Sequence, residues 1–118
     1  MGSDDSGVCL FLLAVLYPMT EREVQKACVK ALEQMGWFVT QFSIPRRAYK
    51  QVVGVPDIYA VHTGHRAQLW LECKRPGGKT RPSQSAWMTR VAASGAICIV
   101  VDSDLKLYDH LRKEEFIA

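Results

Sequence analysis

The spacing of apolar residues after position 19 switches between a helical and a strand-like period. Apolar residues recur every three or four positions from Val24 onward, which predicts an amphipathic helix over Glu21–Met35. Thr20 can cap this helix because Glu23 stands three residues later, as a capping box requires, and Gly36 is a typical stop signal. The pattern therefore predicts the start and the end of the helix as well as its buried face.

Three segments rich in β-branched and aromatic residues follow and indicate strands. The first is Trp37–Ile44, which Pro45 closes. The second and third are Asp57–His62 and Ala67–Cys73. A short turn with a glycine separates these two strands, so we expect them to pair as a hairpin.

The last third of the chain predicts a helix, a strand and another helix. The first of these helices covers roughly Ser83–Ser94, and Gly95 ends it. Ala96–Val101 is apolar throughout, which is typical of a strand buried on both faces, and Leu105–Phe116 is amphipathic. The order is α-β-β-β-α-β-α, and we expect one α/β domain.

The first 18 residues differ from the rest of the chain. Val8–Tyr17 is an uninterrupted apolar run, shorter than the ~20 residues that a membrane-spanning helix requires. Asp4 and Asp5 stand where a signal peptide carries positive charge, and no small-residue cleavage site follows. We therefore expect residues 1–18 to be an extension, either upstream sequence or an artificial addition, that packs as an extra helix or mediates self-association. Residues 19–118 form the predicted domain, with no membrane partner.

The composition is that of a globular protein with a mildly basic surface. Of the 118 residues, 48% are hydrophobic and 23% are charged, which argues against a disordered chain. The net charge of +3 permits contacts with a phosphate backbone but does not require them. The basic residues concentrate in two segments: Arg46, Arg47 and Lys50, with Tyr49 among them, and Lys74, Arg75, Lys79 and Arg81. Solvated loops are the alternative interpretation of both segments.

The cysteines and histidines show no metal-binding spacing. The four cysteines contain no C-x-x-C pair, so free thiols in a reducing compartment are the economical interpretation. This favours the cytoplasm, or the host cytoplasm for a viral protein. His62 and His65 lie around the predicted hairpin turn, where a histidine is usually only solvated. No G-x-x-x-x-G-K-[ST] loop is present, which argues against a nucleotide cofactor.

The residues with the strongest chemical signal lie at one end of the predicted hairpin. Glu72 and Lys74 are two positions apart on a strand, so their side chains share a face while Cys73 points to the opposite one. The Cys73 backbone carbonyl lies between them, and Asp57 opens the neighbouring strand. Carboxylate and carbonyl oxygens suit one or two hard divalent cations. The alternative is an idle surface ion pair, which would be costly to bury at the end of so apolar a strand.

These residues resemble a known arrangement. Gly54-Val55-Pro56-Asp57, followed by Leu71-Glu72-Cys73-Lys74, resembles the PD-(D/E)xK motif of restriction-endonuclease-like nucleases. The Gly-rich basic loop over residues 75–81, the Ser83-Gln84 pair and Trp87 are similar to the VRR-NUC family, and the likeness covers about residues 20–102. The resemblance implies a restriction-endonuclease-like domain with a central mixed β-sheet flanked by helices.

The resemblance also implies roles for individual residues. Asp57, Glu72 and the Cys73 backbone carbonyl would coordinate the metal. Lys74 would orient or activate the attacking water and stabilise the charge of the transition state. Gln84 would contact the site, with simple hydrogen bonding at the helix start as the alternative.

The first helix is where the family pattern is least certain. The resemblance implies an acidic residue there that completes the metal site, and Glu21 is the first candidate. Gln25, four residues later on the same helix face, is the second, although many relatives carry glutamate at that position. Glu23 is the third, but its capping role explains it without catalysis.

The function that the resemblance implies is a Mg²⁺- or Mn²⁺-dependent endonuclease acting on structured DNA such as four-way junctions or flaps. Stand-alone members of this length resemble phage or mobile-element enzymes, for which homodimers are expected. The DNA contacts would come from the two basic segments: Arg46, Arg47, Tyr49, Lys50, Arg75, Lys79 and Arg81. The alternatives are a catalytically silent nucleic-acid-binding module and, with no recognition elements visible, a disfavoured sequence-specific restriction enzyme.

Overall fold

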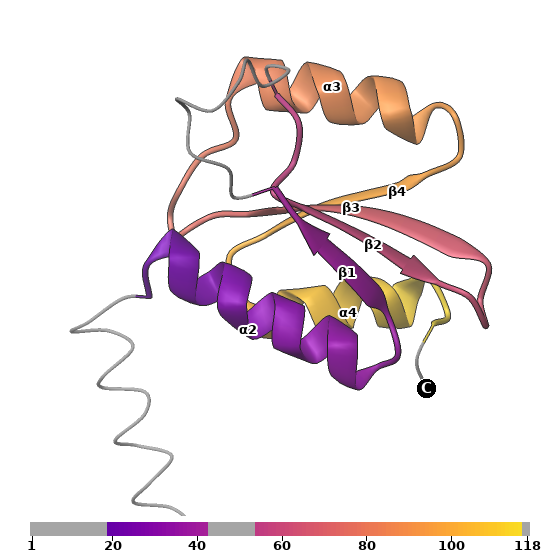
Figure 1. Cartoon of the computed structure of the whole chain (residues 1–118). Helices are drawn as coiled ribbons and strands as arrows, with labels where there is room; N and C mark the ends of the chain where they lie inside the picture. The colour runs from indigo at the N-terminus through magenta and orange to yellow at the C-terminus, as the bar shows by residue number, and fades with distance from the viewer. Residues whose placement is uncertain (1–18, 43–53, 117–118) are drawn as a thin grey trace, which may run out of the picture.

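The computed structural model of the chain describes residues 19–42 and 54–116, which form three helices and four strands. In chain order these are α2 (Glu21–Gln34), β1 (Phe38–Gln41), β2 (Ile58–His62), β3 (Ala67–Cys73), α3 (Pro82–Ala92), β4 (Ile97–Val101) and α4 (Asp104–Lys113) (Figure 1). The predicted order α-β-β-β-α-β-α is therefore confirmed.

The four strands form one mixed sheet in the order β1-β2-β3-β4. β1 and β2 are antiparallel, β2 and β3 form the predicted antiparallel hairpin, and β3 and β4 are parallel. β2 therefore begins at the end of the sheet where β3 and β4 finish. Ile58 pairs with Leu71 at this end, so Asp57 and Glu72 come opposite each other across the two strands.

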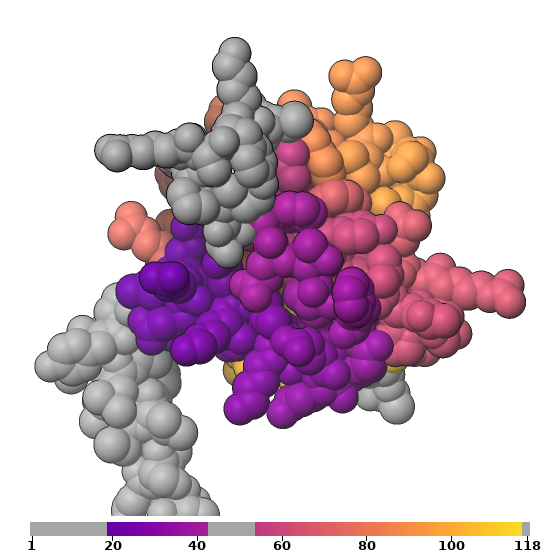
Figure 2. All heavy atoms as spheres, viewed as in Figure 1, coloured from indigo at the N-terminus to yellow at the C-terminus, as the bar shows by residue number. Residues whose placement is uncertain are grey.

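Helices cover both faces of the sheet, with α2 and α4 on one face and α3 on the other (Figure 1). Along β3, the alternate residues Leu69, Leu71 and Cys73 are fully buried in the core. The same core includes fully buried side chains from the two helices on that face: Val24, Cys28, Leu32, Leu107 and Leu111. Burial of this apolar surface holds α2 against the strands. In the space-filling view α2 and β1 lie side by side on the near surface (Figure 2).

The opposite face of the sheet carries an aromatic cluster under α3. Trp70 lies at its centre, with ring centroids 4.4 Å from Tyr59, 4.8 Å from Trp87 and 6.0 Å from Phe42. Trp87 belongs to α3, so its contact with Trp70 anchors this helix on the sheet. Glu72 is the next residue of β3 on this face, because side chains alternate along a strand.

The N-terminus of α2 has the capping box that the sequence predicts. The Glu23 backbone N–H donates to the Thr20 hydroxyl at 3.2 Å, and the Thr20 backbone N–H donates to the Glu23 carboxylate at 3.2 Å. A helix start leaves such N–H groups without intrahelical partners, so the box stabilises the first turn. Glu21, the first residue of the helix, is thereby held in a defined place.

β4 is less buried than its sequence predicts. Its apolar run is typical of a strand covered on both faces, yet Val100 is 37% exposed and Cys98 is only partly buried. β4 is an edge strand of the sheet, so no other strand among the described residues shields its outer side. The prediction of burial on both faces is therefore wrong.

Several predicted boundaries also shift. Trp37 lies outside β1, because its backbone N–H donates to the Leu32 carbonyl oxygen at 3.0 Å in the turn that ends α2. Its ring is buried in the core, 5.2 Å from the ring of His62. Pro82 begins α3, since proline suits the first helical position, and the Ser103 hydroxyl caps α4. The predicted end of the first strand, Ile44, and the predicted extension over residues 1–18 lie outside the described residues. Within the described residues, no helix is long and apolar enough to cross a membrane.

Candidate active site

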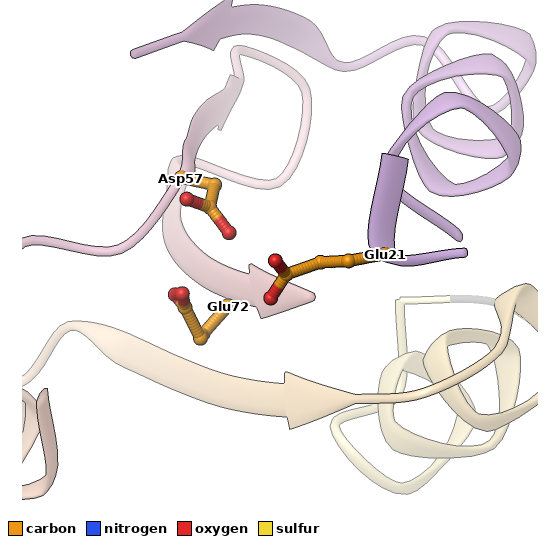
Figure 3. A group of neighbouring side chains, drawn as sticks. All are labelled: Glu21, Asp57 and Glu72. Atoms are coloured by element: carbon orange, nitrogen blue, oxygen red, sulfur yellow. The ribbon is translucent and has the colours of Figure 1, made fainter. Parts of the chain in front are cut away.

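Three carboxylates from different parts of the fold meet at the end of the sheet where β2 begins (Figure 3). Glu21 comes from the first turn of α2, Asp57 from the residue before β2, and Glu72 from β3. One oxygen of each lies within 4.8 Å of the others. This spacing is compatible with three oxygen ligands around a single hard cation.

Glu72 is the most deeply buried of the three, with an exposed fraction of 1%. Its Oε1 accepts a hydrogen bond from the Gln84 side-chain amide at 2.9 Å, whereas its Oε2 has no donor among the described residues. Asp57 Oδ2 also lacks a donor there. Buried acceptors without donors are costly unless a proton or a cation joins them. The residues therefore fit a divalent metal ion.

Lys74 supplies the positive charge next to these carboxylates. Its Nζ lies 3.7 Å from Glu72 Oε1 and 3.8 Å from Glu21 Oε1, and its side chain is 13% exposed. The lysine follows the last residue of β3 and shares a strand face with Glu72, as the two-residue spacing predicts. One ammonium group thus connects the helical carboxylate to the strand carboxylate.

The pKa of Glu72 is raised from 4.5 to about 8. Burial contributes most, because it disfavours the charged form of the carboxyl group. The negative charge of Asp57 raises the pKa further, as does the hydrogen bond that Glu72 donates to Asp57 once it is protonated, while Lys74 lowers it. Below this pH the metal-free site therefore holds a proton on Glu72, which can bridge to Asp57.

We expect the free energy of unfolding of the metal-free protein to fall as the pH rises from about 5 to about 8. In this interval the folded protein keeps the proton of Glu72, whose pKa is about 8, whereas an unfolded glutamate with a pKa of 4.5 has released it. The stability that proton uptake provides is therefore present at low pH and lost on the way to pH 8. Thermal unfolding in EDTA across this range measures the effect.

Glu72→Gln is the control for this pH dependence, because the glutamine side chain does not titrate. Its profile should be flatter than that of the wild type over the same range. A wild-type profile as flat as that of the variant would contradict the raised pKa of Glu72.

Gln84 combines the two roles considered for it from the sequence. Its amide nitrogen donates to Glu72, and its amide oxygen accepts a hydrogen bond from the Arg81 backbone N–H at 3.0 Å. The oxygen therefore caps the start of α3 while the nitrogen reaches the carboxylate. Having one partner for each end fixes the orientation of the amide.

The remaining candidates for the metal site, on α2 and at the end of β3, are placed differently. Glu23 is engaged in the capping box. Among the described residues, no side-chain hydrogen bond or ion pair joins Gln25 to the three carboxylates. The Cys73 thiol is buried in the core, where a hydrogen bond with Cys28, together with burial, raises its pKa far above the usual range. Metal coordination by the Cys73 carbonyl stays a prediction.

The predicted DNA-binding residues fall into two groups. Arg75, Lys79 and Arg81 are exposed in the loop that follows Lys74 and leads into α3. The remaining four lie outside the described residues: Arg46, Arg47, Tyr49 and Lys50.

His62 has a structural role at the far end of β2. Its Nδ1 accepts a hydrogen bond from the His65 backbone N–H at 3.2 Å, so Nε2 carries the proton and donates to the Met35 carbonyl oxygen at 3.1 Å. The expectation that it is only solvated is wrong, because the hairpin turn folds back onto the end of α2.

Comparison with known proteins identifies the fold. No protein-family model and no curated protein matches the chain. Among solved structures, a chain described as "VRR_NUC domain" is similar, with 27% sequence identity and a TM-score of 0.64. The match covers 80% of this chain and 97% of that one.

The fold, the carboxylate cluster and the likeness to the VRR_NUC domain together point to a nuclease of the restriction-endonuclease-like class. Within that class, the likeness to a VRR_NUC domain supports membership of the VRR-NUC family. A nuclease of this fold implies the use of a divalent metal ion and DNA as its partner.

Proposed function

We propose that the protein is a divalent-metal-dependent endonuclease that hydrolyses phosphodiester bonds in structured DNA, such as four-way junctions or flaps. The observation that carries the proposal is the convergence of Glu21, Asp57 and Glu72. Two of their oxygens lack a donor among the described residues, and Lys74 lies beside them. Metal-assisted hydrolysis of a phosphodiester requires such carboxylates, and a cation near the reacting phosphate favours it.

The three carboxylates would hold Mg²⁺ or Mn²⁺, with the Cys73 carbonyl as a further ligand. A bound ion supplies Lewis acidity to the scissile phosphate and lowers the pKa of a nucleophilic water. Glu72 keeps its orientation through the Gln84 amide, so Gln84 acts as a positioning residue. Lys74 is the candidate catalytic residue: its ammonium group can donate hydrogen bonds to the attacking water and to a negatively charged phosphate oxygen.

DNA binding would centre on the loop between β3 and α3. Arg75, Lys79 and Arg81 are exposed there and follow the site directly. The first turn of α3 contains no acidic residue, so its partial positive charge is not offset and favours a phosphate nearby. From the sequence we also expect DNA contacts from Arg46, Arg47, Tyr49 and Lys50, which lie outside the described residues.

Replacing Arg75, Lys79 and Arg81 together by glutamine should weaken DNA binding and reduce its salt dependence. Loss of three phosphate contacts lowers the slope of log K against log salt concentration by about 2 to 3. Fluorescence anisotropy at several salt concentrations, in EDTA to prevent cleavage, measures both quantities.

A charge-matched control is available on α4, which covers the other face of the sheet (Figure 1). Lys106, Arg112 and Lys113 are exposed there, and their replacement by glutamine removes the same charge. Equal losses in the two triple variants would show that only net charge matters and would contradict a binding surface at the β3–α3 loop.

The proposed function is tested by incubating labelled four-way junction, flap and linear duplex DNA with the protein and Mg²⁺ or Mn²⁺. We expect the wild type to cut the branched substrates in preference to the duplex and Asp57→Ala to cut none. DNA binding without cleavage in either metal would favour the silent binding module. Light scattering of the protein with and without a junction tests the proposed homodimer.

A further inference from the structure

The turn that leads into Asp57 contacts the start of α3 through Gly54. A Cβ atom placed on Gly54 would collide with the Ser83 carbonyl oxygen, and it would lie 2.8 Å from the Ser83 carbonyl carbon and 3.3 Å from the Gln84 nitrogen. These are backbone atoms, which cannot rotate away as the end of a side chain can. Gly54 also has a φ of +92°, in the region that side chains rarely adopt. Because of this contact and this φ, any residue other than glycine at position 54 would require the backbone to shift.

This contact connects the segment that positions Asp57 with the helix start that positions Glu72. On one side, Gly54 lies in the short segment that ends in Asp57; on the other side, Ser83 and Gln84 form the first turn of α3. Gln84 in turn holds Glu72 at 2.9 Å. The Trp87–Trp70 contact anchors α3 one turn further along, and the contact with Gly54 is a second point at which α3 meets the rest of the fold.

We propose that Gly54 is a positioning residue of the metal site. Its missing side chain lets the Asp57 turn seat directly on the first turn of α3, which keeps the Gln84 amide on Glu72 and keeps Glu72 beside Asp57. The inference rests on the proposed function, because it concerns the affinity of that site for a divalent ion. An added methyl group would push the helix start away and release Glu72 from its hydrogen bond.

Gly95 provides a matched control. It has a φ of +100°, but a Cβ atom placed there meets no atom within 4 Å. Gly77, with a φ of +82°, is equally open. Alanine at these positions therefore carries the same backbone strain as alanine at Gly54, without the collision. The difference in Mn²⁺ affinity between Gly54→Ala and Gly95→Ala therefore reports the effect of the contact with α3 alone.

The test is a calorimetric titration with Mn²⁺, and circular dichroism confirms that each protein is folded. The titration compares the wild type with four variants: Gly54→Ala, Gly95→Ala, Gln84→Ala and the double variant Gly54→Ala/Gln84→Ala. Loss of a residue that supports a metal ligand usually weakens affinity about 10- to 100-fold, which we expect for Gly54→Ala and for Gln84→Ala. Gly95→Ala should bind as the wild type does. The double variant should bind no more weakly than the weaker single variant, since both act through one hydrogen bond.

The positioning role would be overturned if Gly54→Ala bound Mn²⁺ like Gly95→Ala, or if the losses of affinity multiplied in the double variant. If Gly54→Ala does not fold, Gly54→Asn and Gly95→Asn replace the pair, because asparagine adopts positive φ more readily than alanine. Unfolding of both Gly54 variants while the Gly95 variants fold would also overturn it, since Gly54 would then serve the fold as a whole. A wild type that binds no Mn²⁺ refutes the proposed function itself, which separates the two failures.

Discussion

Glu72→Gln is expected to abolish DNA cleavage while raising the thermal stability of the metal-free protein at pH 9. Glutamine has nearly the same size and still accepts the hydrogen bond from Gln84, but it cannot carry the charge that a divalent ion requires of its ligand. Loss of an outer support already weakens metal binding by about 10- to 100-fold, so loss of the ligand itself should weaken Mn²⁺ binding by more than about 100-fold. At pH 9 the wild-type carboxylate is charged, 1% exposed and beside Asp57, and glutamine removes that repulsion.

Three measurements check this prediction: cleavage rate, Mn²⁺ affinity by calorimetry, and melting temperature in EDTA. Glu33→Gln is the matched control, because it makes the same substitution at an exposed position of α2. It should leave all three unchanged. A Glu72→Gln variant that cuts DNA at the wild-type rate, or that melts at a lower temperature at pH 9, would contradict the assigned role.

Lys74→Met is expected to have the opposite effect on metal binding and to slow DNA cleavage strongly. Methionine keeps most of the length and packing of the lysine but lacks its ammonium group. Removing a group that assists the attacking water or the charged phosphate should lower the single-turnover rate by about 10²- to 10⁴-fold. Mn²⁺ should bind more tightly, because the ammonium within 4 Å of Glu21 and Glu72 no longer offsets their charge.

The pair of readouts distinguishes Lys74 from the carboxylates, since only the lysine variant keeps the ion while losing the rate. Lys106→Met on α4 serves as the control, where the lysine forms an ion pair with Asp102 at 2.8 Å and is exposed. Cleavage by Lys74→Met at the wild-type rate would remove the lysine from the mechanism. Weaker Mn²⁺ binding would mean that it supports the site structurally.

The strand geometry of the site could be predicted from the sequence because it depends on local rules. Side-chain alternation places Glu72 and Lys74 on one face and Cys73 on the other, and the short hairpin brings Asp57 opposite Glu72. The boundaries of β3 match the prediction for the same reason, since apolar and turn residues mark both ends. The capping box likewise needs only neighbouring residues.

Features that depend on packing between distant elements could not be predicted. Three residues of the first helix were candidates for the metal site, and Glu21 is the one the fold places beside Asp57 and Glu72, because the first turn of α2 reaches this end of the sheet. The raised pKa of Glu72 and the exposure of Val100 also follow from tertiary arrangement, as burial on a given face is set by the elements that cover it. No local pattern determines the position at which a helix lies on a sheet.

The position of Glu21 in the terminal turn of a helix gives the site one labile member. Helix ends open locally at much lower cost than core strands such as β3, which carries Glu72, and β2, which Asp57 directly precedes. The Thr20–Glu23 capping box, of a kind typically worth about 1 kcal/mol, opposes this fraying. Ion binding and closure of the first turn of α2 are coupled, because the ion would be held by both α2 and the sheet. A bound ion would therefore stabilise the end of the helix. We therefore expect hydrogen exchange to slow most in the first turn of α2 when the ion binds. The sheet should exchange slowly both with and without the ion.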